Sequence, residues 1–295
     1  MVIRRTGTNG NDTIKAVKTG GGFLGIGKDF ESWEIKGLGG NDSLTGGSKR
    51  DTLDGGSGID TLVGGDFNDR YFVDRPEDIV IEQSSGGADD LIMSKASRYF
   101  LPNHVENIDI DEPNLFRAEA IGNALNNDMF GADTTQEDFL AGVNGNDRLF
   151  GFNNRDTLLG GDGNDTLDGG NGNDSLDGSR GNDRLIGGSG DDTLRGSSFS
   201  SGTDFDFDIL EGGSGRDLFI LGDGNSSLYD DNGSNDFASI LDFRLDSDRL
   251  QLGGTRSDYT VNGATLLRNN DLIAVFEGHS ETSLNAALQF NTDFG

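Results

Sequence analysis

The sequence predicts an all-β protein that is built as a solenoid, a stack of short coils. The first observation is a nine-residue period: an Asp recurs six times between Gly142 and Arg195, with a Leu two places after each. The second is composition, because 48 of the 295 residues are Gly and only 32% are hydrophobic. The third is that each x-Leu-x triplet has room only for a very short strand. Two repeats would therefore form one coil of turn, strand, turn and strand.

Each position of the repeat has a physical role. The recurring aspartates are Asp147, Asp156, Asp165, Asp174, Asp183 and Asp192. The leucines that would fill the thin space between two parallel sheets are Leu149, Leu158, Leu167, Leu176, Leu185 and Leu194. Gly at positions 1, 2 and 4 permits a positive φ, so that the backbone can turn sharply and aim its carbonyl oxygens at one place. The Asp at position 6 adds a carboxylate, and hard oxygen ligands of this kind suit calcium.

Blocks such as GGDGNDTLD and GGNGNDSLD follow the pattern G-G-x-G-x-D-x-U-x, where U is a large apolar residue. This pattern resembles the nonapeptide repeat of the RTX family, a signature of calcium-binding parallel β-helices. The resemblance implies a right-handed parallel β-roll or β-helix with several stacked Ca²⁺ ions. As metal-binding residues it implies the aspartates above and the turn glycines Gly161, Gly163, Gly170, Gly172, Gly188 and Gly190. One Leu per nine residues is little core, so we expect folding to require the ions.

The N-terminal part is predicted as a first β-roll over residues 1–74. Four blocks place Asp42, Asp51, Asp60 and Asp69 nine residues apart, and GTNGNDTI adds Asp12 in an opening half-coil. Residues 15–36 interrupt the register and are expected to form a loop or a cap. Lys49 and Phe67 stand where the fourth Gly belongs. We therefore expect the turns of Asp51 and Asp69 to bind ions weakly or not at all.

Residues 75–127 are predicted as a β-helix-like connector whose longer strands continue the solenoid around a wider core. The nine-residue register is lost from Phe72 onward, and apolar runs such as DIVIE and VENIDI replace it. The segment is similar to connectors found in RTX-repeat proteins. Four acidic residues of this segment are interpreted as solvated turn residues: Asp89, Asp90, Asp109 and Asp111.

A second β-roll is predicted over residues 128–220, with a loop insertion at 196–207. After the insertion the register resumes with Asp208 and with Asp217, whose turn contains Gly213 and Gly215. Residues 221–295 are predicted as short strands and turns that cap the open end of the solenoid, because an open end exposes unpaired strand edges. By resemblance, the tail is where a type I secretion signal would lie.

Alternate repeats lie on the same edge of the roll, which predicts two rows of stacked aspartates. One row contains Asp147, Asp165, Asp183 and Asp208, and the other contains Asp156, Asp174, Asp192 and Asp217. By resemblance, an ion is held between successive turns of a row. Asp165 and Asp174 are interior members, so we expect their loss to be the most damaging, and we expect the loss of Asp69 to matter much less.

Charge and missing residue types exclude several classes of protein. A formal net charge of −29 argues against a nucleic-acid partner, and the absence of Cys excludes disulfides and thiolate chemistry. We expect no transmembrane segment and no classical signal peptide, because no apolar run is long enough. The resemblance implies secretion to the cell surface by the type I route. His104 and His279 are isolated, and neither H-E-x-x-H nor G-x-S-x-G occurs, so we expect no enzyme.

Two functions remain open. The first is a non-catalytic extracellular calcium-binding protein with a structural or interaction role, in a surface layer, a matrix or a self-assembling filament. The alternative is a calcium-stabilised accessory module of a polysaccharide-active enzyme, similar to those of alginate epimerases, or a polysaccharide-binding module. The expected partners are therefore calcium and either a second copy of the chain or a cell-surface polysaccharide.

Overall fold

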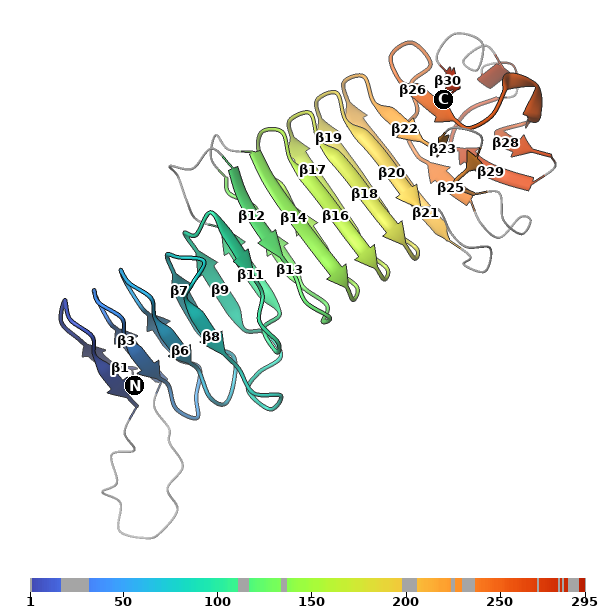
Figure 1. Ribbon diagram of the computed structural model, residues 1–295. Helices are drawn as coiled ribbons and strands as arrows, with labels where there is room; N and C mark the ends of the chain where they lie inside the picture. Colours follow the sequence, from blue (N-terminus) through green and yellow to red (C-terminus); the bar gives the residue numbers. More distant parts are fainter. Residues whose placement is uncertain are drawn as a thin grey trace. The chain divides into compact units, whose positions relative to one another are not determined.

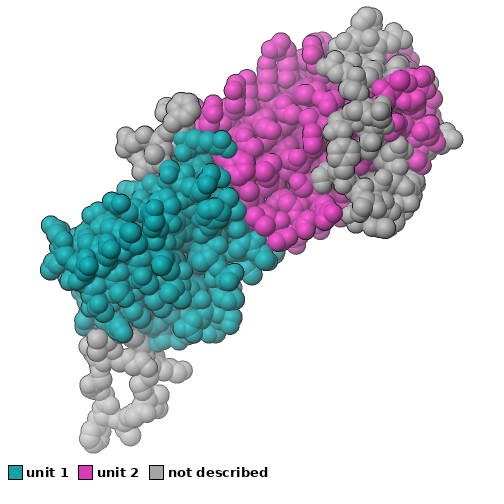
Figure 2. Space-filling model, viewed as in Figure 1, with its two compact units in different colours: residues 1–132 teal, residues 133–295 magenta. Residues whose placement is uncertain are grey.

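A computed structural model describes residues 2–16, 32–110, 117–133, 137–197, 206–223, 226–229, 237–269, 271–280, 282, 284–285 and 292–294. The chain forms two compact units, residues 1–132 and residues 133–295 (Figure 2). Each consists almost wholly of short strands in parallel sheets (Figure 1), which confirms the predicted all-β solenoid.

Unit 1 is a stack of coils in which every second strand pairs in parallel. One sheet has the order β1, β3, β5, β7, β9, β11 and β13, a second has β2, β4, β6 and β8, and β10 pairs with β12. The strands are β1 (Val2–Thr6), β2 (Thr13–Lys15), β3 (Ser32–Lys36), β4 (Ser43–Thr45), β5 (Thr52–Asp54), β6 (Thr61–Val63), β7 (Arg70–Val73), β8 (Ile79–Ile81), β9 (Leu91–Ser94), β10 (Arg98–Phe100), β11 (Asn107–Ile110), β12 (Arg117–Ile121) and β13 (Asp128–Phe130).

The core of unit 1 contains columns of stacked apolar side chains. Ile35, Leu53, Tyr71 and Ile92 are register partners in successive strands, and all four are fully buried. Alternate residues of a strand point to opposite faces, so most of the strands bury only one or two side chains. The repeat therefore supplies a continuous core from very few apolar residues.

The predicted insertion at 15–36 is too long. β2 extends to Lys15, and β3 begins at Ser32 and buries Trp33 and Ile35. Trp33 lies opposite Ile3 of β1, so the end of the expected loop is itself a strand of the solenoid. The sequence does not reveal it because no nonapeptide turn precedes SWEIK. Residues 17–31 lie outside the described residues.

The connector strands are only slightly longer than those of the first roll. Strands β8 to β12 have three to five residues, whereas β4 to β6 have three and β16 to β19 of unit 2 have six. The spacing between equivalent residues changes instead: Asp69 and Asp90 are 21 residues apart, whereas Asp42 and Asp60 are 18 apart. The additional residues lengthen the turns, because the strands stay short.

Unit 2 contains two parallel sheets that share the coils. One has the order β15, β17, β19, β21, β25, β29, β28 and β27, and the other has β14, β16, β18, β20, β22, β26 and β30. The elements are β14 (Glu137–Asn144), β15 (Arg148–Phe150), β16 (Thr157–Asp162), β17 (Thr166–Asn171), β18 (Ser175–Arg180), β19 (Arg184–Ser189), β20 (Thr193–Ser197), β21 (Phe207–Ser214), β22 (Leu218–Ile220), β23 (Gly222–Asp223), β24 (Ser226–Ser227), β25 (Phe237–Ile240), β26 (Arg249–Leu252), η1 (Arg256–Asp258), β27 (Tyr259–Asn262), β28 (Thr265–Arg268), β29 (Asp271–Phe276) and β30 (Thr292–Phe294).

The predicted leucines form the core of unit 2. Leu149, Leu167, Leu185 and Leu210 are register partners in one sheet, and all are fully buried. The aspartates that precede Leu185 and Leu210 are 25 residues apart, although the usual spacing is 18. The predicted insertion at 196–207 therefore leaves the stack unbroken, and residues 198–205 lie outside the described residues.

The C-terminal part of unit 2 first continues the parallel sheets and then departs from them. β25 and β29 extend one sheet, and β26 and β30 extend the other. β28 pairs antiparallel with both β27 and β29. Near this end, Nε2 of His279 lies 2.6 Å from the carbonyl oxygen of Phe243, whose ring packs against Phe219 and Phe276. This histidine therefore serves the packing of the C-terminal part.

Candidate metal centre

The aspartates of unit 2 form the two predicted rows. The backbone N–H groups of Asp147, Asp165 and Asp183 donate to Oδ1 of the next Asp in the row at 2.8, 2.8 and 2.9 Å. In the other row, Asp156, Asp174 and Asp192 donate in the same way at 2.8, 2.8 and 3.1 Å. These bonds connect the eight predicted aspartates into two rows, and all eight residues are 2% exposed or less. The second row continues, because Asp217 N–H donates to Oδ1 of Asp248 at 3.2 Å. The pairing predicted from the spacing is confirmed.

The second oxygen of these carboxylates is buried and lacks a partner. Within the described part of the chain, Oδ2 of five row members has no hydrogen-bond partner: Asp156, Asp165, Asp174, Asp183 and Asp192. Leaving a buried carboxylate oxygen unsatisfied is costly. The turns therefore contain acceptor atoms that a cation could satisfy.

The turn glycines are required for two different reasons. Those at positions 2 and 4 have positive φ: Gly161, Gly163, Gly170, Gly172, Gly188, Gly190, Gly213 and Gly215. The expectation of a positive φ at position 1 is wrong. A Cβ on Gly160 or Gly178 would instead collide with Oδ2 of the Asp in its own turn and would press on a carbonyl oxygen of the next coil. Position 1 is glycine because oxygen atoms crowd around its Cα.

Burial raises the pKa of the row carboxyls from Asp156 onward, because a carboxylate loses its hydration inside the turn. The pKa is raised to about 6 for Asp165 and Asp174, to about 7 for Asp192 and to about 9 for Asp183. Neighbouring carboxylates add to the rise for Asp183 and Asp192, while the N–H bond from the preceding Asp opposes it. A divalent cation would offset both burial and repulsion, so the donor set fits a hard cation such as Ca²⁺.

Unit 1 contains two shorter rows of the same kind. In one, the N–H groups of Asp12, Asp42 and Asp60 donate to the next Asp at 2.7, 2.8 and 2.9 Å, and the row ends at Asp78. In the other, Asp51 donates to Asp69 at 2.6 Å and Asp69 donates to Asp90 at 2.5 Å. The rows of unit 1 therefore contain the five predicted aspartates and two that the sequence analysis missed, Asp78 and Asp90.

Asp78 and Asp90 were missed for different reasons. Asp78 lies nine residues after Asp69 and two before Val80, so the register continues for one more repeat than was predicted. Asp90 was interpreted as a solvated turn residue, and this is wrong, because its side chain is fully buried. Its turn is longer than nine residues allow, which removes it from the register.

The turn at Asp69 keeps the backbone conformation of the other turns, although Phe67 replaces its fourth glycine. Phe67 adopts the positive φ of the missing glycine, at 70°. Its ring lies under the ammonium group of Lys49, 4.5 Å from the centroid, one coil earlier. A cation–π contact of this kind offsets part of the cost of the left-handed conformation. Asp69 therefore keeps its place in the row.

The comparison with protein families agrees with this geometry. Four segments match the model of the RTX calcium-binding nonapeptide repeat: residues 36–71, 134–167, 168–200 and 203–237. The chain carries RTX calcium-binding repeats. The matched segments cover a little under half of its length, and their calcium-binding description supports Ca²⁺ as the cofactor. No curated protein matches the chain.

At the C-terminal end of the RTX rows, two side chains donate hydrogen bonds to oxygen atoms of the kind that lack a partner in the interior turns. Nη2 of Arg244 donates to Gly215 O at 2.6 Å, to Asp217 Oδ2 at 3.0 Å and to Asp248 Oδ1 at 3.2 Å. In the other row, the hydroxyl of Tyr229 donates to Asp208 Oδ2 at 2.6 Å. Arg244 lies outside the matched repeat segments, and Tyr229 lies in the irregular end of the last one, so no periodic signal predicts either residue.

In the RTX turns of unit 2, Ca²⁺ would be held by the stacked aspartates together with the carbonyls of the fourth-position residues. A Cβ on Gly163 would collide with Gly145 O, and one on Gly190 with Gly172 O, so these carbonyls point at the next turn.

Among the described residues, no helix has the length and apolar character needed to span a bilayer.

Proposed function

We propose that the chain is a non-catalytic, calcium-dependent structural or interaction protein that folds and acts outside the cell. The observation that carries the proposal is the row of buried Oδ2 atoms without partners in unit 2. Such a row gains more from cations than an exposed acidic surface would, because its carboxylates have lost their water.

Calcium would then decide where the protein folds. The site is assembled from successive coils, so it is absent in the unfolded chain and its binding free energy becomes folding free energy. A chain with a net charge of −29 would remain unfolded in the calcium-poor cytosol and fold after export. This behaviour suits type I secretion, in which the unfolded chain is exported.

Self-association is the interaction that we favour. Ile79 and Ile81 lie on the outward face of β8 and are 51% and 44% exposed. Apolar side chains that line an open sheet face are typical of contact surfaces. Light scattering should detect polymers that require calcium. A protein that stays monomeric and is retained on an alginate column would instead support the polysaccharide-binding function.

The test of calcium-dependent folding is far-ultraviolet circular dichroism on the full chain. The protein with excess chelator should show little β-structure, and millimolar Ca²⁺ should restore it. Mg²⁺ is the matched control and should restore much less, because it requires a compact octahedral shell and gives up water reluctantly. A β-sheet signal that is the same with chelator and with Ca²⁺ contradicts the proposal.

A further inference from the structure

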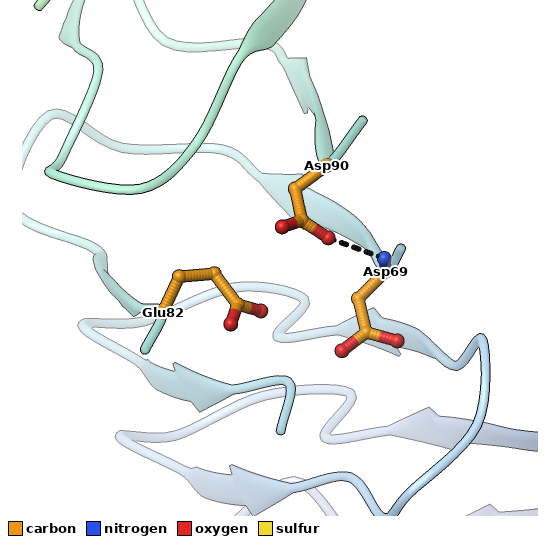
Figure 3. A group of neighbouring side chains, drawn as sticks. All are labelled: Asp69, Glu82 and Asp90. Atoms are coloured by element: carbon orange, nitrogen blue, oxygen red, sulfur yellow. Dashed lines mark hydrogen bonds between the residues drawn. The ribbon is translucent and has the colours of Figure 1, made fainter. Parts of the chain in front are cut away.

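We infer that unit 1 holds a second kind of Ca²⁺ site, built by Asp69, Glu82 and Asp90 outside the repeat pattern. One carboxylate oxygen of each residue lies within 4.8 Å of the others, and all three residues are buried. Figure 3 shows the carboxylates of Asp69 and Glu82 turned toward one another, with Asp90 bonded to the backbone of Asp69. Glu82 and Asp90 lie outside every matched RTX segment, so this site goes beyond the proposed function.

The chain brings the three groups together through a lengthened turn. Asp69 ends the turn before β7, whereas Glu82 and Asp90 begin and end the turn one coil later, between β8 and β9. Glu82 stands nine residues after Val73 and directly after β8, where a repeat would place its first glycine. The turn from Glu82 to Asp90 is longer than a repeat turn, which gives the glutamate side chain room to fold inward.

Glu82 supplies a charged oxygen where the repeats offer a neutral one. In a normal turn, a Cβ on the first glycine would meet the Asp Oδ2 and the carbonyl oxygen of the first glycine one coil on, as at Gly160. At Gly64 the same Cβ would collide with Asp69 Oδ2, Glu82 Oε1 and the hydroxyl oxygen of Tyr71. Beside Gly64, the carboxylate of Glu82 thus takes the place of the carbonyl group found in a normal turn. Three side-chain oxygens, from Asp69, Tyr71 and Glu82, lie around this glycine.

Two oxygen atoms of this group still lack a partner. Oδ2 of Asp69 and Oδ2 of Asp90 are buried without hydrogen bonds in the described part of the chain, and the side chains are 3% and 0% exposed. The hydroxyl of Tyr71 donates to Glu82 Oε1 and satisfies only that oxygen. The charged groups that act on Glu82 and Asp90 are also acidic, namely Asp89, Asp90 and Glu106. A bound cation would coordinate the two free oxygen atoms and would also reduce the repulsion between the neighbouring carboxylates.

The donors favour Ca²⁺ over softer or smaller ions. Every donor is an oxygen, and the carbonyls of Gly65 and Gln83 lie beside Glu82 Oε2 around Gly86. Calcium accepts six to eight oxygen ligands in irregular geometry, whereas Mg²⁺ does not. Asp69 also borders a surface cleft of about 450 Å³.

The test measures bound Ca²⁺ on the full chain for Glu82→Gln. The matched control is Glu77→Gln, which changes an exposed glutamate in the coil that contains β8. By equilibrium dialysis, Glu82→Gln should bind one Ca²⁺ fewer than the parent, and Glu77→Gln should bind the same number. Without Ca²⁺, Glu82→Gln should be at least as stable as the parent, because it removes a buried like charge. Equal stoichiometry in Glu82→Gln and Glu77→Gln would overturn the site.

Terbium gives a readout that does not depend on ion counting. Tb³⁺ replaces Ca²⁺ at oxygen sites and emits when an excited tyrosine lies nearby, as Tyr71 does here. Tyr71→Phe should retain the ion but lose part of the tyrosine-sensitised emission, and unchanged emission would overturn the site even if Glu82→Gln failed to fold. Asp174→Ala, which removes repeat ions of unit 2, should leave the Tyr71-dependent emission intact. Failure of the repeat ions and failure of this site are thereby distinguished.

Discussion

Nη2 of Arg244 lies 3.0 Å from Oδ2 of Asp217, near the C-terminal end of an RTX row. The guanidinium thus supplies, from the chain itself, the positive charge that the buried carboxylate needs. Further along the same row, Asp174 and Asp192 offer Oδ2 atoms without a partner. The last turns of unit 2 therefore differ from the interior turns in their need for an external cation, although the backbone geometry is the same.

Replacing Arg244 with Gln should destabilise unit 2 in saturating Ca²⁺ by about 1–3 kcal/mol, since charge-assisted bonds to two buried aspartates are lost. The guanidinium is partly exposed, which keeps the effect below that of a fully buried pair. Thermal unfolding measures it. Arg216→Gln is the control, because that side chain is 75% exposed and pairs with Asp191 at the surface. Equal losses in both variants would contradict the role given to Arg244.

Asp174→Ala should weaken calcium binding by roughly tenfold or more, because it removes a shared carboxylate and the acceptor for Asp156 N–H. The loss should extend to the neighbouring coils, since solenoid coils depend on their nearest neighbours. Calorimetric titration gives the midpoint and the stoichiometry. Asp162→Ala is the control, because Asp162 is exposed and only 3.6 Å from Arg180 in a surface pair. If Asp162→Ala lowers affinity as much, the rows are not the binding sites.

Asp69→Ala should now be as harmful in unit 1 as Asp174→Ala in unit 2, which reverses the expectation from the sequence. Asp69 accepts the N–H of Asp51, and its own N–H donates to Asp90. Replacing it with Ala would leave the Asp51 N–H without its acceptor and take away a carboxylate. The same titration applies. A much smaller effect at Asp69 would restore the interpretation of a weak turn.

The pH dependence should have opposite signs with and without Ca²⁺. The pKa is about 6 for Asp165 and Asp174 and about 9 for Asp183, against about 3.9 in the unfolded chain. A raised pKa stabilises the calcium-free fold fully below about pH 4, and this contribution is lost as the pH rises through the folded values. In Ca²⁺ the carboxylates must be ionised, so the calcium midpoint should increase as the pH falls from 8 to 5.

Circular dichroism of dialysed protein measures the pH dependence of the calcium-free fold. Titration with Ca²⁺ at several pH values measures the pH dependence of the calcium midpoint. The calcium-free chain should show more β-structure near pH 4 than at pH 8. More β-structure at pH 8 than at pH 4 would mean that the carboxylates are not buried as described.

The repeats allowed the central site to be predicted. Because the period is nine and two repeats form a coil, Asp147 must stack on Asp165, and the structure has this pairing. Asp90 escaped because its turn is longer than the period allows, and Glu82 escaped because it stands at a position where the repeat has a glycine and no ligand side chain. Arg244 escaped because its role depends on a contact across 27 residues with Asp217, in a segment without repeats. Tertiary contacts between irregular segments leave no periodic trace in a sequence.

The regular 18-residue spacing of unit 2 has a mechanical consequence. Each coil is held by its neighbours alone, so a pulling force would detach coils one after another. Every detached coil would release about 60 Å of extended chain, from roughly 3.3–3.6 Å per residue. Under tension the solenoid would lengthen in equal steps, and the surrounding calcium concentration would set the force at which each step occurs.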